Sequence, residues 1–230
     1  MKSLVLCMVL IPHLLSLDFL DQWITWNVGQ GLFSTLATRN SCLHFDFGGE
    51  VFPNPVLNLC QNKINYLFLS HEHKDHFVFA KKLLSTVSIC RTFATLKPQL
   101  LKIPRCPSLP HKVSALFNQP LFRDKNSNSK VYGYANKILF PGDSLKKSEA
   151  LWAPQLKPTF KYWILAHHGS RTSTSPLFLE NLPQVQFAIA SSRYKKYGHP
   201  HNIILDRLKA KKIPVLKTQD WGHIRVLLNL

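Results

Sequence analysis

The sequence predicts a layered α/β domain whose polar residues lie along one edge of its sheets. Hydrophobic residues make up 45% of the 230 positions and charged residues only 18%, so the chain can bury a large core and does not resemble a disordered chain. Short apolar runs of β-rich composition each end in a polar loop, and helical patterns follow two of them.

The first part of the chain predicts a β meander followed by a buried strand and a helix. Turn residues, among them Gly29, Gly31 and Gly48, separate the early apolar runs. The run at 64–69 is almost continuously apolar, as expected for a strand that is covered on both faces. The predicted elements are strands at 23–28, 32–38, 42–47 and 64–69 and a helix at 77–84.

Residues 86–130 are rich in Pro, Ser, Asn and Lys and predict a surface loop or a lid. Regular structure is expected again after this segment, and most of its strands deliver polar residues at their C-terminal ends. The predicted elements are strands at 137–140, 162–166, 187–190, 214–216 and 224–228 and a helix at 203–210.

The chain is strongly basic. It holds 29 Lys and Arg against 12 Asp and Glu, a formal charge of +17 at pH 7. Such a charge favours polyanionic partners, with nucleic acid first and an anionic membrane surface second. A solvated basic face without a partner is the alternative that charge alone leaves open.

The N-terminal residues are expected to form a separate segment. An apolar stretch of about 14 residues follows Lys2 and is shorter than the roughly 20 that a membrane-spanning helix needs, so it fits a signal-peptide core better. No small-residue cleavage site follows, which leaves an uncleaved anchor open. We therefore divide the chain into a signal-like or anchor-like segment, 1–20, and a domain, 21–230. An extracytoplasmic location is favoured over a cytoplasmic one.

Five cysteines, at positions 7, 42, 60, 90 and 106, show neither Cys-x-x-Cys nor zinc-ribbon spacing. Most are expected to be small core residues. Disulfide pairing cannot be read from their spacing.

Three imidazoles and a carboxylate follow the strand at 64–69 directly: His71, His73, Asp75 and His76. In an extended loop His71 and His73 project to the same side, whereas Asp75 and His76 begin the next turn, so one segment can ligate two adjacent metal ions. Imidazole and carboxylate together suit Zn, Mn or Fe.

This His-x-His-x-Asp-His motif resembles the signature of the metallo-β-lactamase superfamily. Within it, the loops at 26–31, 45–49, 141–143, 167–170 and 197–200 match the order and approximate spacing of the C-terminal hydrolase domain of the ComEC family of DNA-uptake proteins. The resemblance runs from about Trp23 to the C-terminus and implies a four-layer αββα sandwich with two divalent metal ions, Zn or Mn.

The resemblance also implies roles for individual residues. The implied ligands are His71 and His73 for the first metal, Asp75 and His76 for the second, Asp143 as the bridge, and His167, preferred to His168, to complete the second site. Asp75 would also orient the attacking water, and His168 would lie near the substrate.

Further residues are expected around these ligands. Asp46 would support the ligand loops from behind, with turn capping as the alternative. His199 would donate a hydrogen bond or a proton to a phosphate, with loop packing as the alternative. Ser170, Arg171 and Thr172 offer donors suited to phosphate, although the residues after them also fit a helix N-cap.

The chain departs from the ComEC-type pattern at several positions. Asn27 and Leu32 stand where that pattern has Asp, and His73 stands where it often has Asp. No counterpart of a further first-site histidine is evident between Asp75 and Asp143. We therefore expect weak binding at the first metal site.

Together these features predict a metal-dependent phosphodiesterase or nuclease that acts on DNA in a ComEC-like DNA-uptake role. DNA, held through its phosphate backbone, is the expected substrate, and a membrane channel protein is the expected partner. The oligomeric state is left open. The alternatives are hydrolysis of a small ester, lactam or thioester, and a catalytically inactive DNA-binding module.

Overall fold

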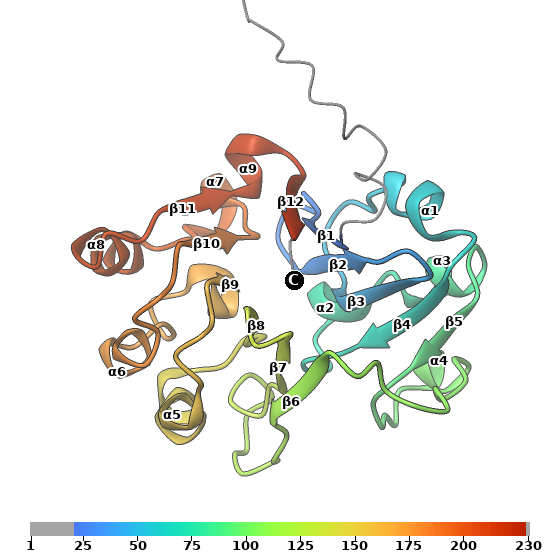
Figure 1. Cartoon of the computed structure of the whole chain (residues 1–230), viewed down its shortest axis with the longest axis horizontal. Helices are drawn as coiled ribbons and strands as arrows, with labels where there is room; N and C mark the ends of the chain where they lie inside the picture. The colour runs from blue at the N-terminus through green and yellow to red at the C-terminus, as the bar shows by residue number, and fades with distance from the viewer. Residues whose placement is uncertain (1–20, 229–230) are drawn as a thin grey trace, which may run out of the picture.

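A computed structural model describes residues 21–228 and shows a four-layer αββα arrangement, as the resemblance to the metallo-β-lactamase superfamily implies. Two six-stranded sheets face each other, and helices cover their outer surfaces (Figure 1). The predicted N-terminal segment, 1–20, lies outside the described residues. Among the described residues no helix combines the length and the apolar character needed to cross a membrane.

The first sheet has the order β12-β1-β2-β3-β4-β5, and its β1–β2–β3 part is the predicted antiparallel meander. β4 and β5 continue this sheet in parallel with β3, whereas β12 closes it antiparallel to β1. Its strands are β1 (Asp21–Thr25), β2 (Phe33–Ala37), β3 (Ser41–Phe47), β4 (Ile64–Phe68), β5 (Ile89–Arg91) and β12 (Ile224–Leu228).

The second sheet has the order β11-β10-β9-β8-β7-β6. β8 to β11 are parallel, so their C-terminal ends meet at one edge. Its strands are β6 (Val113–Phe117), β7 (Val131–Tyr134), β8 (Ile138–Phe140), β9 (Tyr162–Ile164), β10 (Phe187–Ala190) and β11 (Val215–Lys217).

Aromatic side chains fill the space between the sheets. Phe45 of β3 and Phe140 of β8 stack with ring centroids 3.9 Å apart, and the edge of Trp23 packs against Phe140. The indole N–H of Trp23 donates to Ser34 Oγ at 2.7 Å, so its one polar atom is satisfied inside the core.

The outer layers bury apolar side chains from short helices. Val56, Cys60, Leu83 and Leu100 pack on the first sheet, and further helices, among them the one that contains Trp152, pack on the second. The helices are α1 (Pro55–Cys60), α2 (Lys74–Phe77), α3 (Ala80–Leu84), α4 (Pro98–Leu101), α5 (Lys146–Trp152), η2 (Ala153–Gln155), η3 (Ala166–Gly169), α6 (Pro176–Glu180), α7 (Tyr194–Tyr197), α8 (Asn202–Ala210) and α9 (Thr218–Trp221).

Two disulfides lie in the half of the molecule that contains the first sheet. Cys42 of β3 is joined to Cys60 of α1, and Cys90 of β5 is joined to Cys106. Cys42 and Cys60 are fully buried, as expected for core residues, whereas Cys90 and Cys106 are half-buried.

Two predictions about local structure are wrong. The helix expected at 77–84 is divided into α2 and α3, because the backbone N–H of Phe79 donates to Phe47 O instead of continuing a helix. The segment 86–130 is not a plain loop: it contains β5, α4 and β6. Long-range contacts organise it, among them the buried Arg91 side chain, which donates to Ile103 O and Phe93 O.

Candidate metal centre

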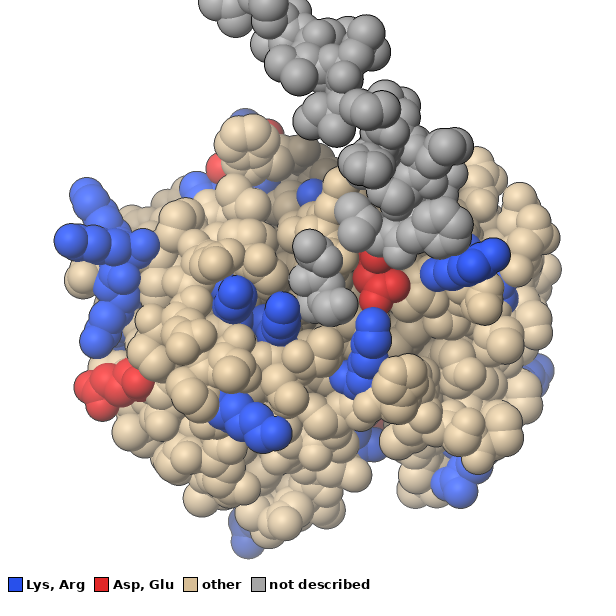
Figure 2. All heavy atoms as spheres, in the orientation of Figure 1, with Lys and Arg blue, Asp and Glu red and all other residues tan. Residues whose placement is uncertain are grey.

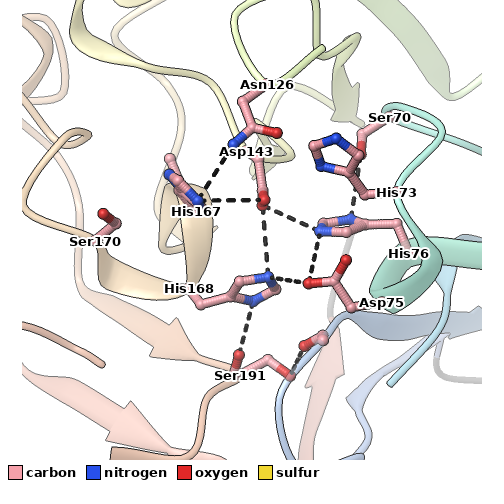
Figure 3. Close-up of polar contacts among 12 residues, drawn as sticks. Ser70, His73, Asp75, His76, Asn126, Asp143, His167, His168, Ser170 and Ser191 are labelled. Carbon is pink, nitrogen blue, oxygen red and sulfur yellow. Dashed lines mark hydrogen bonds and ion pairs between the residues drawn. The ribbon is translucent and has the colours of Figure 1, made fainter. Parts of the chain in front are cut away.

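The ends of strands from both sheets deliver the predicted ligands to one place (Figure 3). His71 and His73 follow β4, and Asp75 and His76 belong to α2. Asp143 follows β8. The His167-His168 pair lies in η3 after β9.

Asp75, His76, Asp143 and His168 form a first group of donor atoms, all within 4.8 Å of one another. His76 Nε2 lies 3.1 Å from Asp143 Oδ1, and His168 Nε2 lies 3.6 Å from the same oxygen and 3.3 Å from Asp75 Oδ2. We call these four residues the Asp75 cluster.

Hydrogen bonds from their Nδ1 atoms orient the two imidazoles of the Asp75 cluster. His76 Nδ1 donates to Asp46 Oδ2 at 2.7 Å, and His168 Nδ1 donates to Ser191 O at 3.0 Å. The Nε2 atoms of both rings are buried and make no hydrogen bond within the described residues. Each Nε2 therefore faces the Asp143 carboxylate, where it can carry a proton or, once a cation displaces that proton, ligate the cation. The residues thus fit a divalent metal ion.

His71, His73 and Asp143 form a second group, which we call the His71 cluster. His71 Nε2 and His73 Nδ1 lie 3.0 Å apart, and His71 Nε2 lies 3.7 Å from Asp143 Oδ2. Asp143 thus presents Oδ1 to the Asp75 cluster and Oδ2 to the His71 cluster, so that one carboxylate serves both.

The geometry favours His168 over His167 in the Asp75 cluster, opposite to the preference drawn from the sequence. His167 Nε2 lies 3.8 Å from Asp143 Oδ2, on the side of the His71 cluster, and accepts from Asn126 Nδ2 at 3.3 Å. The reason is the backbone: both histidines have left-handed φ values, 50° and 57°, and the resulting turn sends their rings to different sides of Asp143. His167 is therefore placed to supplement the His71 cluster.

Asp46 lies behind the Asp75 cluster, outside the cavity. Its Oδ1 accepts the Ser70 N–H at 2.7 Å, and its Oδ2 accepts both Ser70 Oγ at 2.8 Å and His76 Nδ1. It therefore joins the end of β4 to the histidine that follows and holds the His76 ring in one tautomer.

The charges in the two clusters are strongly coupled. Burial alone would raise the pKa of Asp143, but the imidazoles of His76, His168 and His71 hold it well below its usual range. Burial likewise opposes the charge of His76, but the Asp143 and Asp46 carboxylates raise the pKa of this ring well above its usual range. The centre therefore keeps its carboxylates ionised at neutral pH.

Glycines let the ligand loops approach each other closely. A Cβ at Gly48, after β3, would collide with the backbone of Asp75. At Gly169, where φ is +85°, a Cβ would lie 2.5 Å from Pro200 Cβ, so the turn that carries the histidine pair packs directly on the loop after α7.

The clusters open into a cavity of about 470 Å³. Predicted site residues on its wall are His73, Asp75, Asp143, His167, His168 and His199. Sequence reasoning did not assign a role to Gln30, Glu50, Lys74, Asn126 or Tyr197, which also line it.

His199 lies at the cavity wall, with its Nδ1 3.4 Å from Gln30 Nε2. Burial, followed by the neighbouring His168 and His167, lowers the pKa of His199 to about 4. The ring is therefore neutral at pH 7 and suited to hydrogen bonding. A bound anion would have to raise this pKa before the ring could donate a proton as an imidazolium.

Ser170, Arg171 and Thr172, expected at the substrate, do not line this cavity. Thr172 Oγ1 lies 3.1 Å from His167 Nδ1 and 2.9 Å from Ser170 Oγ, so these hydroxyls hold the His167 ring. The N-cap alternative is realised by Ser175, whose Oγ accepts the Phe178 N–H at the start of α6.

Asn126 is the least expected residue of the centre, because it belongs to the polar segment predicted as a surface loop. Ser129 Oγ accepts the Asp143 N–H at 3.1 Å, and Asp124 Oδ1 accepts the Ser127 N–H, so this segment folds against the ligands. Asn126 Oδ1 is buried without a hydrogen bond among the described residues. The polar composition of this segment does not predict that Asn126 lies at the metal centre.

In sequence, the chain is similar to competence proteins. It is 28% identical over 236 residues to Recombination protein 2 of Haemophilus influenzae and 29% identical over 218 residues to Competence protein ComA of Neisseria gonorrhoeae. The matches cover 88% and 87% of this chain but only 28% and 31% of those proteins, so the chain spans less than a third of their length. No protein-family model matches it.

In structure, the chain is similar to metallo-β-lactamase fold proteins. YhfI of Bacillus subtilis has a TM-score of 0.58 at 11% identity and covers 90% of this chain and 100% of its own. Igni18, a metallo hydrolase of Ignicoccus hospitalis, has a TM-score of 0.54 at 10% identity and also covers 90% of this chain and 100% of its own. A diphosphatase of the PhnP family has a TM-score of 0.53 at 13% identity and covers 86% of this chain and 85% of its own. The predicted metallo-β-lactamase fold and the ComEC-like resemblance are confirmed.

Proposed function

We propose that this chain is a metal-dependent hydrolase of phosphodiester bonds and that it acts on DNA in a DNA-uptake process. The observation that carries the proposal is the placement of Asp143, which offers one carboxylate oxygen to each of two donor clusters. The names of the similar competence proteins and of the similar diphosphatase support the choice of substrate and process.

The Asp75 cluster would hold one divalent ion, and the His71 cluster, supplemented by His167, a second. Two such ions lower the pKa of a bound water and neutralise charge on a phosphate oxygen. The side chain of Asp75 is 39% exposed and that of Asp143 only 4%, so Asp75 is the carboxylate that can meet and orient an attacking water. The His199 N–H and Lys74, both on the cavity wall, are placed to bind phosphate oxygens.

The surface charge fits a polyanionic substrate. Figure 2 shows basic side chains spread over one face of the molecule and few acidic ones. Three acidic side chains are buried and add no negative charge to the surface: Asp46, Asp143 and Glu149. The outer surface is therefore more basic than the formal charge of +17 alone suggests. A small neutral substrate would need no such surface.

We also propose an extracytoplasmic location, with a DNA-transporting membrane protein as partner. Two disulfides support the location, because disulfides persist in oxidising compartments. The competence relatives support the partner.

The test is cleavage of single- and double-stranded DNA by the purified protein loaded with Mn or Zn, with elemental analysis of the same samples. We expect close to two ions per chain, metal-dependent cleavage, and DNA binding that weakens steeply with salt as counterions are released. Asp75→Asn should abolish cleavage and leave DNA binding largely intact. Absence of bound metal would refute the hydrolase, and flat salt dependence would instead favour a small ester, lactam or thioester.

A further inference from the structure

Three aromatic side chains of the described chain are unusually exposed. Trp221 is 71% exposed, Tyr194 46% and Tyr197 43%. The other four tryptophans are at most 2% exposed, so Trp221 is an exception in a chain that otherwise buries this residue type. Large aromatic side chains gain stability from burial, and an exposed group of them commonly marks a binding surface.

The three aromatic residues come from two neighbouring helices, α7 and α9, which lie next to each other in Figure 1. The Tyr194 N–H at the start of α7 donates to Gln219 Oε1 of α9 at 2.7 Å, which fixes the two helices together. Tyr197 at the end of α7 lines the cavity of the metal centre, and its hydroxyl donates to Glu50 Oε1 at 3.3 Å. This surface is therefore continuous with the candidate active site.

Basic side chains accompany the aromatic ones. Arg193 and Lys196 each lie 2.9 Å from a carboxylate oxygen of Glu50, and Lys217 lies 3.4 Å from Asp220 Oδ2. Lys195 makes no ion pair within the described residues. Four basic groups less two acidic ones leave this surface with a net charge of +2.

We propose that this surface, the α7–α9 ledge (Arg193 to Tyr197, Lys217 and Trp221), binds single-stranded nucleic acid by base stacking and leads the strand into the metal centre. Exposed aromatic rings beside basic groups are the features that bind unpaired strands, because every base offers a flat face and every linkage a negative charge. A duplex keeps its base faces stacked internally and cannot offer them. The proposal rests on the proposed function only for the cleavage that would follow binding.

Trp221 provides a direct test. Because the other four tryptophans are buried, a change in tryptophan fluorescence on binding reports mainly on Trp221. We would titrate the full chain, in EDTA so that no cleavage occurs, with oligothymidylate and with a duplex of equal length. We expect the single strand to change the fluorescence strongly and the duplex weakly, and we expect Trp221→Phe to remove the signal.

Affinity is measured separately with a labelled oligonucleotide. Trp221→Ala and Tyr194→Ala should each weaken single-strand binding by about tenfold or more, the range found for loss of a stacked base. Leu96→Ala is the matched control, because Leu96 is 91% exposed and lies just before α4, on the other side of the molecule from α9. Unchanged affinity in both ledge variants, or equal fluorescence changes with strand and duplex, would overturn the proposal.

A parallel assay of the unmodified protein on a chromogenic phosphodiester separates the two proposals. Binding through the ledge without any phosphodiester cleavage would refute the proposed function and leave the ledge standing. If the protein cleaves the phosphodiester but the ledge substitutions leave its single-strand binding unchanged, the ledge proposal is refuted and the proposed function stands.

Discussion

Replacing Asp46 by Asn should weaken metal binding although Asp46 would not touch the metal. Asp46 Oδ2 accepts the Nδ1–H of His76 at 2.7 Å, and this bond keeps Nε2 of His76 directed at Asp143, where its lone pair is available to a cation that displaces the Nε2 proton. An amide in this place can donate its own N–H to Nδ1. The ring would then carry its proton on Nε2, and a ligand nitrogen would become a donor that points into the site.

The expected size follows from how such supporting hydrogen bonds act elsewhere. Loss of the partner of a ligating histidine costs about 10- to 100-fold in metal affinity, which is about 1.4 to 2.7 kcal/mol. The larger value is expected here because His76 is fully buried and cannot turn toward water. The Asp75 cluster should bind its metal ion more weakly, whereas the metal affinity of the His71 cluster should change little.

The assay is a competitive titration with a chelating indicator, together with elemental analysis and urea unfolding. Asp206→Asn on α8 is the matched control, since this exposed carboxylate lies far along the chain from every ligand. Wild-type affinity at both sites in Asp46→Asn, with unchanged stability, would refute the tautomer argument.

Further predictions concern the ligands, the core and the disulfides. Asp143→Asn should lower metal content at both sites, because each cluster uses one of its oxygens, and loss of one ion only, by elemental analysis, would contradict the shared role. His199→Ala should lower kcat by about 100-fold with both ions retained, as for other lost donors to a developing charge, and equal loss of metal would make His199 a ligand. Burial lowers the pKa of His44 to about 4 in spite of the hydrogen bond that its Nε2–H donates to Asn65 Oδ1. Below pH 6.5 the His44 imidazole therefore binds more protons in the unfolded chain than in the folded one. The contribution of His44 to stability should be constant above pH 6.5 and fall by about 3 kcal/mol toward pH 4, a loss that urea unfolding should show as a difference from His44→Gln. Reduction of the two disulfides, which close loops of 18 and 16 residues, should cost about 3 kcal/mol each, seen as a lower Tm with dithiothreitol.

Elements with strong local patterns could be predicted from the sequence. The apolar run of β4 and the ligand motif after it carry both their secondary structure and their chemistry in a few consecutive residues. The short helices and strands between residues 86 and 130 could not be predicted, because they depend on the Cys90–Cys106 disulfide and on carbonyl groups held by Arg91. Such long-range contacts leave no periodic signal.

The residues of the site show the same division. Asp143 could be predicted because it follows a clear strand, in a loop that resembles the ComEC-type pattern. The sequence could not separate His167 from His168, since the choice depends on two consecutive left-handed residues. The place of Asn126 in the site could not be predicted at all, because the composition of a polar segment does not indicate which of its side chains will point into the protein.

The pairing of β1 with β12 has a consequence for the order of synthesis. Ile224 to Leu228 form the edge of the sheet that also contains β1 to β5, so this sheet cannot be completed until the ribosome has passed residue 228. The donor clusters likewise draw on α2 from the early part of the chain and on η3 from the late part. A partly synthesised chain therefore lacks the complete set of donor atoms until His168 of η3 has been made.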